Sequence, residues 1–185
     1  MTAPVKSTDT SSNPKKDRRP KPAAAPKRVR SAPRTTARLA AVQALYEIEL
    51  SSSGAHEVVP DMIGRGFANL LEDSKIETAR PDAAFFETLV LGTSGERSTL
   101  DDMIRSTLDQ DGHFERLELI IRGILRLGAY ELLTQSDVPA RVVIAEYMDL
   151  ADAFFGGREP ALVNGVLDKI AHTVREDEFT GGKAE

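Results

Sequence analysis

The chain changes character at one stretch, Arg34-Thr35-Thr36-Ala37-Arg38-Leu39-Ala40-Ala41-Val42-Gln43-Ala44-Leu45-Tyr46. Its apolar side chains recur at the spacing of one helix face, and Arg34 and Arg38 lie one helical turn apart. The stretch therefore predicts a first helix over residues 36–50. We interpret the start of that helix as the entrance to a nucleic-acid binding site.

The net charge of −5 hides two oppositely charged parts. Residues 1–38 hold eleven Lys and Arg against two Asp, a net charge of +9, whereas residues 39–185 carry −14. A basic arm suits a polyanion, and an acidic body repels one except where Arg side chains cluster.

Residues 1–33 hold six of the ten prolines and few large apolar side chains. Such a segment cannot bury enough surface to offset the entropy of ordering, so we predict a disordered, basic N-terminal tail. Its first 26 residues fit a solubilising tail as well as a functional one. The remaining basic residues converge on the helix start, where backbone N–H groups also favour anions. They are Lys27, Arg28, Arg30, Arg34 and Arg38.

Periodicity and Pro or Gly boundaries predict five further helices. We expect them at 60–72, 81–108, 116–135, 139–155 and 160–174. The glycines within 81–108 allow either one bent helix or two helices, and we favour one because the apolar spacing resumes in phase. Four of the five begin at a proline. No segment alternates as a strand does. The fold class is therefore all-α, a compact bundle of six or seven helices over 34–175, followed by a polar C-terminal tail over 176–185.

The sequence shows no arrangement of residues that is typical of catalysis. The chain has no Cys, and none of its three His lies at a metal-ligand spacing from a second His or a carboxylate. No phosphate-binding loop or nucleophile-elbow motif occurs. No apolar run approaches the roughly 18 residues of a membrane span, and the N-terminus lacks the apolar segment of a secretory signal. We expect a non-enzymatic, cytoplasmic binding protein without cofactors, although composition alone leaves a transit peptide open.

The first helix carries one candidate binding set. Arg34 and Arg38 supply phosphate contacts, Tyr46 a stacking ring, and Gln43 a base-edge amide. The spacing of eight places Arg38 and Tyr46 on one face. Tyr46 fits equally well as a core aromatic whose hydroxyl reaches the rim. Thr35 or Thr36 is expected to cap the helix.

A second candidate set lies in Val163-Asn164-Gly165-Val166-Leu167-Asp168-Lys169. Gly165 among helical apolar residues favours close packing, as do Gly123 and Gly128 in the helix over 116–135. Asn164 is compatible with a cap, a hydrogen bond to a neighbouring helix or a contact with a ligand.

Three segments resemble the NusB family of bacterial transcription antitermination factors. They are Ala37-Arg38 with Ala41-Val42-Gln43-Ala44-Leu45-Tyr46; Ile124-Leu125-Arg126-Leu127 with Ala129-Tyr130-Glu131-Leu132-Leu133 and Asp137-Val138-Pro139; and Val163-Asn164-Gly165-Val166-Leu167-Asp168-Lys169-Ile170. They occur in the family's order, and the resemblance covers about residues 34–174. It implies an all-helical fold of two packed subdomains.

The resemblance also implies a function. It points to binding of boxA-like single-stranded RNA in transcripts of ribosomal RNA operons, together with a small-subunit ribosomal protein, NusE, in the RNA polymerase antitermination complex. RNA contacts map onto Arg34 and Arg38. Because Thr35 and Thr36 interrupt the arginine run, we expect Lys27, Arg28 and Arg30 of the arm to compensate. Tyr46 is expected near the RNA or the ribosomal protein. Leu162 and Asn164 are expected to bind the protein partner.

The chain departs from the family pattern at five single positions and in one motif, where the usual Ile-Asn-Glu-Ala reads Ile144-Ala145-Glu146-Tyr147. Thr35 and Thr36 interrupt the arginine run, Leu162 replaces a frequent Phe, Ala140 replaces a Tyr, and Ile121 stands where many relatives are acidic. These departures predict changed partner contacts within an unchanged fold.

Two alternatives and one question accompany this interpretation. The chain could be a protein–protein scaffold with a non-specific polyanion-binding arm. NusB-like domains also precede methyltransferase domains, but this chain contains no α/β catalytic half, so methyl transfer is not expected. The question is whether the chain forms a homodimer through its partner-binding face, which the sequence does not decide.

Overall fold

The computed structural model describes residues 32–68, 79–108 and 114–180. These residues form α-helices and one 3-10 turn, with no strand among them, which confirms the all-α prediction. The helices are α1 (Pro33–Leu50), α2 (Ala55–Gly64), α4 (Ala83–Gly95), α5 (Arg97–Thr107), α6 (Leu119–Thr134), α7 (Ala140–Phe154), α8 (Glu159–Val174) and α9 (Glu176–Thr180), with the 3-10 turn η1 at Phe114–Arg116. The predicted tail over 1–33 falls almost wholly outside the described residues.

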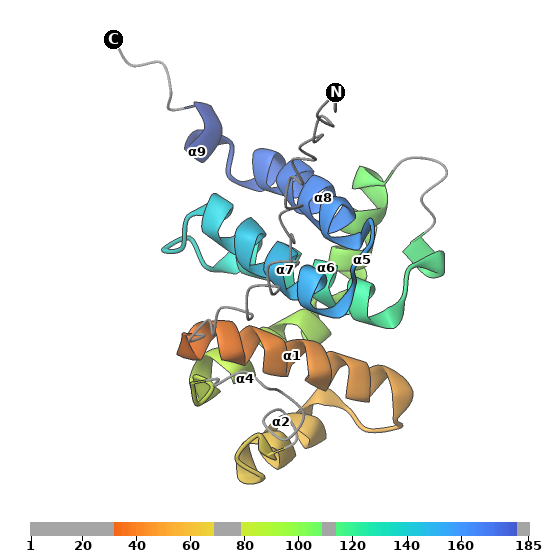
Figure 1. Cartoon of the computed structure of the whole chain (residues 1–185), viewed down its shortest axis with the longest axis vertical. Coiled ribbons are helices and arrows are strands. Elements are labelled where there is room, and N and C mark those ends of the chain that lie inside the picture. Colours follow the sequence, from red (N-terminus) through yellow and green to blue (C-terminus); the bar gives the residue numbers. More distant parts are fainter. Residues whose placement is uncertain (1–31, 69–78, 109–113, 181–185) are drawn as a thin grey trace, which may run out of the picture.

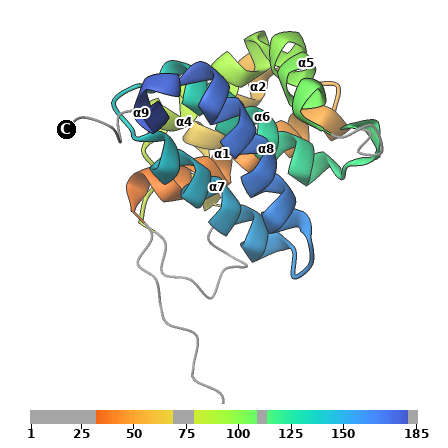
Figure 2. The ribbon, with the colours of Figure 1, turned by 90° about the horizontal axis from the view of Figure 1, so that it is seen from above.

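The helices form two packed subdomains, as the family resemblance implied (Figure 1). One contains α1, α2 and α4, which contact one another. In the other, α6, α7 and α8 pack together, with α5 against α6 and α8. Helices α1 and α4 also contact α6, which joins the subdomains. Seen from above, α7 and α8 lie in front of α1 (Figure 2).

Helix α6 is the central element, as its apolar residues on several faces predicted. Its fully buried side chains include Ile124, Leu125 and Leu127. Arg126 is also buried, and its guanidinium donates to Asp101 of α5 over 2.6 and 3.0 Å and to Glu49 of α1 over 2.7 Å. Polar and apolar contacts of α6 therefore reach both subdomains.

The close approach predicted at Gly128 is confirmed, whereas Gly165 has none. A Cβ at Gly128 would lie 2.6 Å from Leu167 Cδ1 and 3.2 Å from Tyr147 Cδ2. A Cβ added at Gly165 meets nothing within 4 Å. Gly128, and not Gly165, is therefore the residue that permits close packing of α6 on α8.

We expect Gly128→Ala to lower the free energy of unfolding by about 1–3 kcal/mol, because the added methyl overpacks a buried contact. Urea denaturation measures the change. Gly165→Ala is the matched control: open space receives its methyl, and alanine favours the helix by up to about 1 kcal/mol. Similar destabilisation by both variants would contradict the packing role of Gly128.

Several predicted helix boundaries were wrong. The segment predicted as one helix over 81–108 divides at Glu96, whose ψ of 15° leaves the helical range, into α4 and α5. Helix α2 begins at Ala55 and contains Pro60 in its interior. Because Pro60 is exposed, water can reach the carbonyl that its missing N–H leaves free. The predicted end at residue 72 lies outside the described residues.

No helix in the three described ranges is long and apolar enough to cross a membrane. Within the same ranges, no group of three or more His, Asp and Glu side chains could hold a metal ion.

Candidate nucleic-acid interface

Arg34 lies exposed at the start of α1. Helix α1 begins at Pro33, and the Ala32 carbonyl accepts from the Thr36 N–H over 3.0 Å. The Arg34 guanidinium lies 4.9 Å from the centroid of the Phe85 ring of α4, and 47% of its side chain is exposed. The apolar ring supports the cation while its N–H groups stay open to solvent, which suits a phosphate contact.

Neither threonine caps α1, so that prediction was wrong. The N-cap residue is Ala32, which offers no side-chain hydrogen bond. The Thr35 hydroxyl instead donates to Glu146 Oε2 of α7 over 2.9 Å, and Thr36 is buried and donates to the Ala32 carbonyl. The two residues that interrupt the arginine run therefore contact neighbouring parts of the fold.

Arg38 is buried and does not lie where it could bind phosphate. Only 3% of the residue is exposed. Its Nε and Nη2 donate to the two carboxylate oxygens of Glu131 in α6 over 3.0 and 2.5 Å, and its Nη1 donates to Glu146 over 3.0 Å. The prediction that Arg38 contacts RNA was therefore wrong. Its role is structural, because its guanidinium N–H groups donate to Glu131 and Glu146 within the fold.

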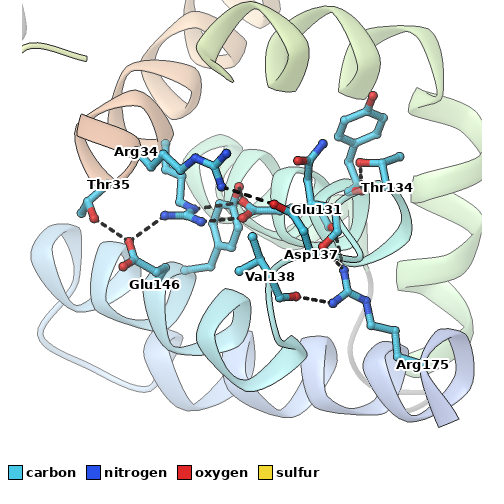
Figure 3. A network of polar contacts seen from close by, with 12 residues as sticks. Arg34, Thr35, Glu131, Thr134, Asp137, Val138, Glu146 and Arg175 are labelled. Carbon is cyan, nitrogen blue, oxygen red and sulfur yellow. Dashed lines mark hydrogen bonds and ion pairs between the residues drawn. The ribbon is translucent and has the colours of Figure 1, made fainter. Parts of the chain in front are cut away.

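Glu131 is the buried centre of this polar network (Figure 3). Besides Arg38, its carboxylate accepts from the Tyr147 hydroxyl over 2.8 Å. Burial raises the pKa of Tyr147 well above its ordinary value, and the charge of Glu131 adds to the shift. Burial alone would lower the pKa of Arg38, but the hydrogen bond and charge of Glu131 outweigh it, so that pKa is raised. Two of the segments that carry the family resemblance thus meet in one ion pair.

Arg175, the last residue of the predicted helical domain, is tied to the same region. Arg175 donates to the carbonyls of Glu131, Leu132 and Gln135 over 2.7–3.1 Å and to Val138 over 2.5 Å. These acceptors are carbonyls in the last turn of α6 and in the turn that follows, where the regular series of helical N–H donors ends.

Helix α9 also contacts the start of α7. Glu178 accepts from the Ala140 N–H over 2.7 Å. This hydrogen bond lowers the pKa of Glu178, and Arg175 lowers it further. Ala140, which replaces a Tyr of the family pattern, is therefore buried beneath α9.

Tyr46 lies on the surface of α1 and not in the core. It is 41% exposed, and Gln43 is partly exposed. Because Arg38 is buried, the prediction that Arg38 and Tyr46 share a face was wrong. Arg34 and Tyr46 are separated by about 18 Å along the axis, at 1.5 Å per residue. A ligand contacting both must extend along α1.

The predicted partner-binding residues do not lie together. Leu162 is partly buried in a groove of about 790 Å³ between the start of α6 and the start of α8, which also contains Ile121. Asn164 is exposed and lines a separate groove between α7 and α8. Ile121 is 2% exposed, so this departure from the family pattern lies in the core at the edge of the Leu162 groove.

Arg80 was missed by the sequence analysis. The Asp82 N–H donates to the Pro33 carbonyl over 3.1 Å, which places the segment carrying Arg80 beside the start of α1. Arg80 is exposed. No helical pattern marks it, and only the fold brings it near Arg34. Arg30, a predicted RNA-binding residue, lies outside the described residues.

The comparisons with known proteins agree with this architecture. A model of the NusB family matches residues 35–172. The transcription antitermination protein NusB of Rhodopseudomonas palustris (strain HaA2) is 42% identical over 149 residues, which cover 80% of this chain and 87% of the relative. NusB of Rhizobium meliloti (strain 1021) is 41% identical over 145 residues, 78% of this chain and 89% of the relative. The structure of T. maritima NusB matches with a TM-score of 0.64 and 26% identity, covering 80% of this chain and 98% of that one. The chain belongs to the NusB family, whose curated relatives are transcription antitermination proteins.

Proposed function

We propose that this chain is a non-enzymatic RNA-binding factor in transcription antitermination of ribosomal RNA operons. It binds boxA-like single-stranded RNA along α1, and it acts with the ribosomal protein NusE in the RNA polymerase antitermination complex. The observation that carries the proposal is Arg34, an exposed cation supported by Phe85 at the point where the basic arm enters the fold. Arg80 beside it and Tyr46 further along α1 extend the surface.

The proposed binding combines phosphate contacts with stacking. Arg34 contacts one phosphate, and the basic residues before the helix, Arg30 among them, add charge. Tyr46 offers an exposed ring on which a base can stack, a contact that accepts any base. Arg38 is excluded from direct contact and holds the helix in place.

We propose the groove at Leu162 as the docking site of the protein partner. It combines the apolar side chains of Leu117, Ile121 and Leu162 with charged residues of both signs, which are Arg116, Glu118, Arg158 and Glu159. An apolar floor with a charged rim is the usual anatomy of a protein interface. This groove also supports the alternative function, a protein–protein scaffold whose basic arm binds polyanions without sequence preference.

Arg34→Ala is expected to weaken binding of boxA-like RNA and to reduce the slope of log affinity against log salt by roughly 0.7, the value for one lost phosphate contact. Fluorescence anisotropy across salt concentrations measures both quantities. Arg65→Ala, which removes an exposed arginine directly after α2, is the matched control and should change neither. An unchanged slope in Arg34→Ala would refute phosphate binding there. Equal affinity of the wild-type chain for boxA-like and scrambled RNA would favour the scaffold.

A further inference from the structure

A carboxylate faces the cation that we propose to bind phosphate. Asp137 Oδ2, in the turn between α6 and α7, lies 3.9 Å from Arg34 Nη1 (Figure 3). The side chain of Asp137 is 68% exposed and that of Arg34 is 47% exposed. At this distance the two side chains form an ion pair but no hydrogen bond. A phosphate that approaches Arg34 therefore also meets the field of a solvent-exposed negative charge.

The backbone on both sides of Asp137 is held in place. The Gln135 carbonyl accepts from the Val138 N–H over 3.1 Å, which closes the turn. Both the Gln135 and Val138 carbonyls accept from Arg175, over 2.8 and 2.5 Å. Because the turn is fixed from two sides, Asp137 can rotate its side chain but cannot withdraw its backbone from the start of α1.

The side of Arg34 that faces α7 carries a second negative charge. Glu146 is 28% exposed and is held by Arg38 and by the Thr35 hydroxyl. The segment that carries Arg80 lies on the α4 side of the same helix end. Phosphate is thus attracted to one flank of Arg34 and repelled from the other.

We propose that Asp137 makes this end of α1 select single-stranded over duplex RNA; the inference rests on the proposed RNA binding at Arg34. A duplex presents two rows of phosphates at a higher charge density than a single strand. With one row at Arg34, the second row faces Asp137 and Glu146. A single strand can direct its uncharged bases to that flank instead. Repulsion of the wrong ligand is a recurrent source of specificity.

The test compares Asp137→Asn with wild type on a labelled single strand and on a duplex of the same sequence and length. Asparagine removes the charge and keeps the ability to hydrogen-bond within a turn. We expect duplex binding to tighten roughly threefold to fivefold and single-strand binding less than twofold, as the loss of one exposed charge allows. Asp102→Asn is the matched control, because Asp102 is 74% exposed and pairs with Arg105 on α5. It should leave the ratio of the two affinities unchanged.

An equal gain for both RNAs, no gain, or the same shift in Asp102→Asn would overturn the selectivity role. Asp137→Ser removes the same charge with a smaller side chain and must reproduce the result, and thermal melting verifies the fold of each variant. Arg34→Ala, measured in parallel, separates the two proposals. If it leaves RNA binding intact, the proposed function fails. If it weakens binding while Asp137→Asn leaves the ratio unchanged, only the selectivity inference fails.

Discussion

Arg38→Ala is expected to lower the free energy of unfolding by about 3–5 kcal/mol, the cost of breaking a buried ion pair by removing one partner. The variant leaves the carboxylate of Glu131, which is 0% exposed, without its bidentate donor. The midpoint of thermal unfolding should fall by roughly 6–20 °C. Chemical denaturation followed by circular dichroism measures the free energy directly.

Two variants show whether burial of the charge causes the loss. Arg65→Ala removes an arginine that is 39% exposed and lies 2.8 Å from Asp61, and it should cost less than about 1 kcal/mol. The double replacement Arg38→Met with Glu131→Leu removes both charges and should recover part of the stability, since apolar pairs often replace buried ion pairs without loss. Recovery is incomplete because the buried Tyr147 hydroxyl loses its acceptor. A double variant as unstable as Arg38→Ala would show that the pair contributes through shape and not through charge.

Arg126→Ala is expected to cost about 3 kcal/mol, the lower end of the range for a broken buried pair. Its guanidinium side chain is 4% exposed, but its partners Asp101 and Glu49 retain 11% and 16% exposure, so water can solvate them in part. Without the contact between Arg126 and Asp101, the packing of α5 on α6 should weaken. The rate of amide hydrogen exchange should therefore rise more in α5 than in α7.

Arg97→Ala provides the matched control for this variant. Arg97 binds the same carboxylate of Glu49 over 2.7 Å, but its side chain is 49% exposed. It should cost less than about 1 kcal/mol. Equal losses in the two variants would mean that the exposed and buried contacts with Glu49 contribute alike.

The helices could be predicted because their signals are local. Apolar spacing placed α1, α6, α7 and α8 close to their observed ranges, and the many-sided apolar pattern of α6 marked it as central. The break at Glu96 could not be predicted in this way, since the apolar spacing resumes in phase after it. The start of α2 was placed wrongly at Pro60, because proline is common at helix starts but is not confined to them.

The role of Arg38 could not be predicted because its partner is distant in the sequence. Glu131 lies 93 residues away, and no periodicity within α1 distinguishes a buried arginine from an exposed one. The family motifs contain both residues but do not say that they meet. Arg80 was missed for a similar reason, since only the hydrogen bond between Asp82 and Pro33 brings its segment to α1. By contrast, the exposure of Arg34 agrees with its place at the end of a basic segment.

The contact between Arg38 and Glu131 also has a consequence for folding while the chain is being synthesised. The ribosome adds about 5–20 residues per second, so the 93 residues between them take about 5–20 s. During that interval, α1 has emerged ahead of the helix that neutralises its buried arginine. Arg175, which holds the end of that helix, comes 44 residues after Glu131. Helix α1 therefore reaches its final packing only after Arg175 has been added, 44 residues later than Glu131.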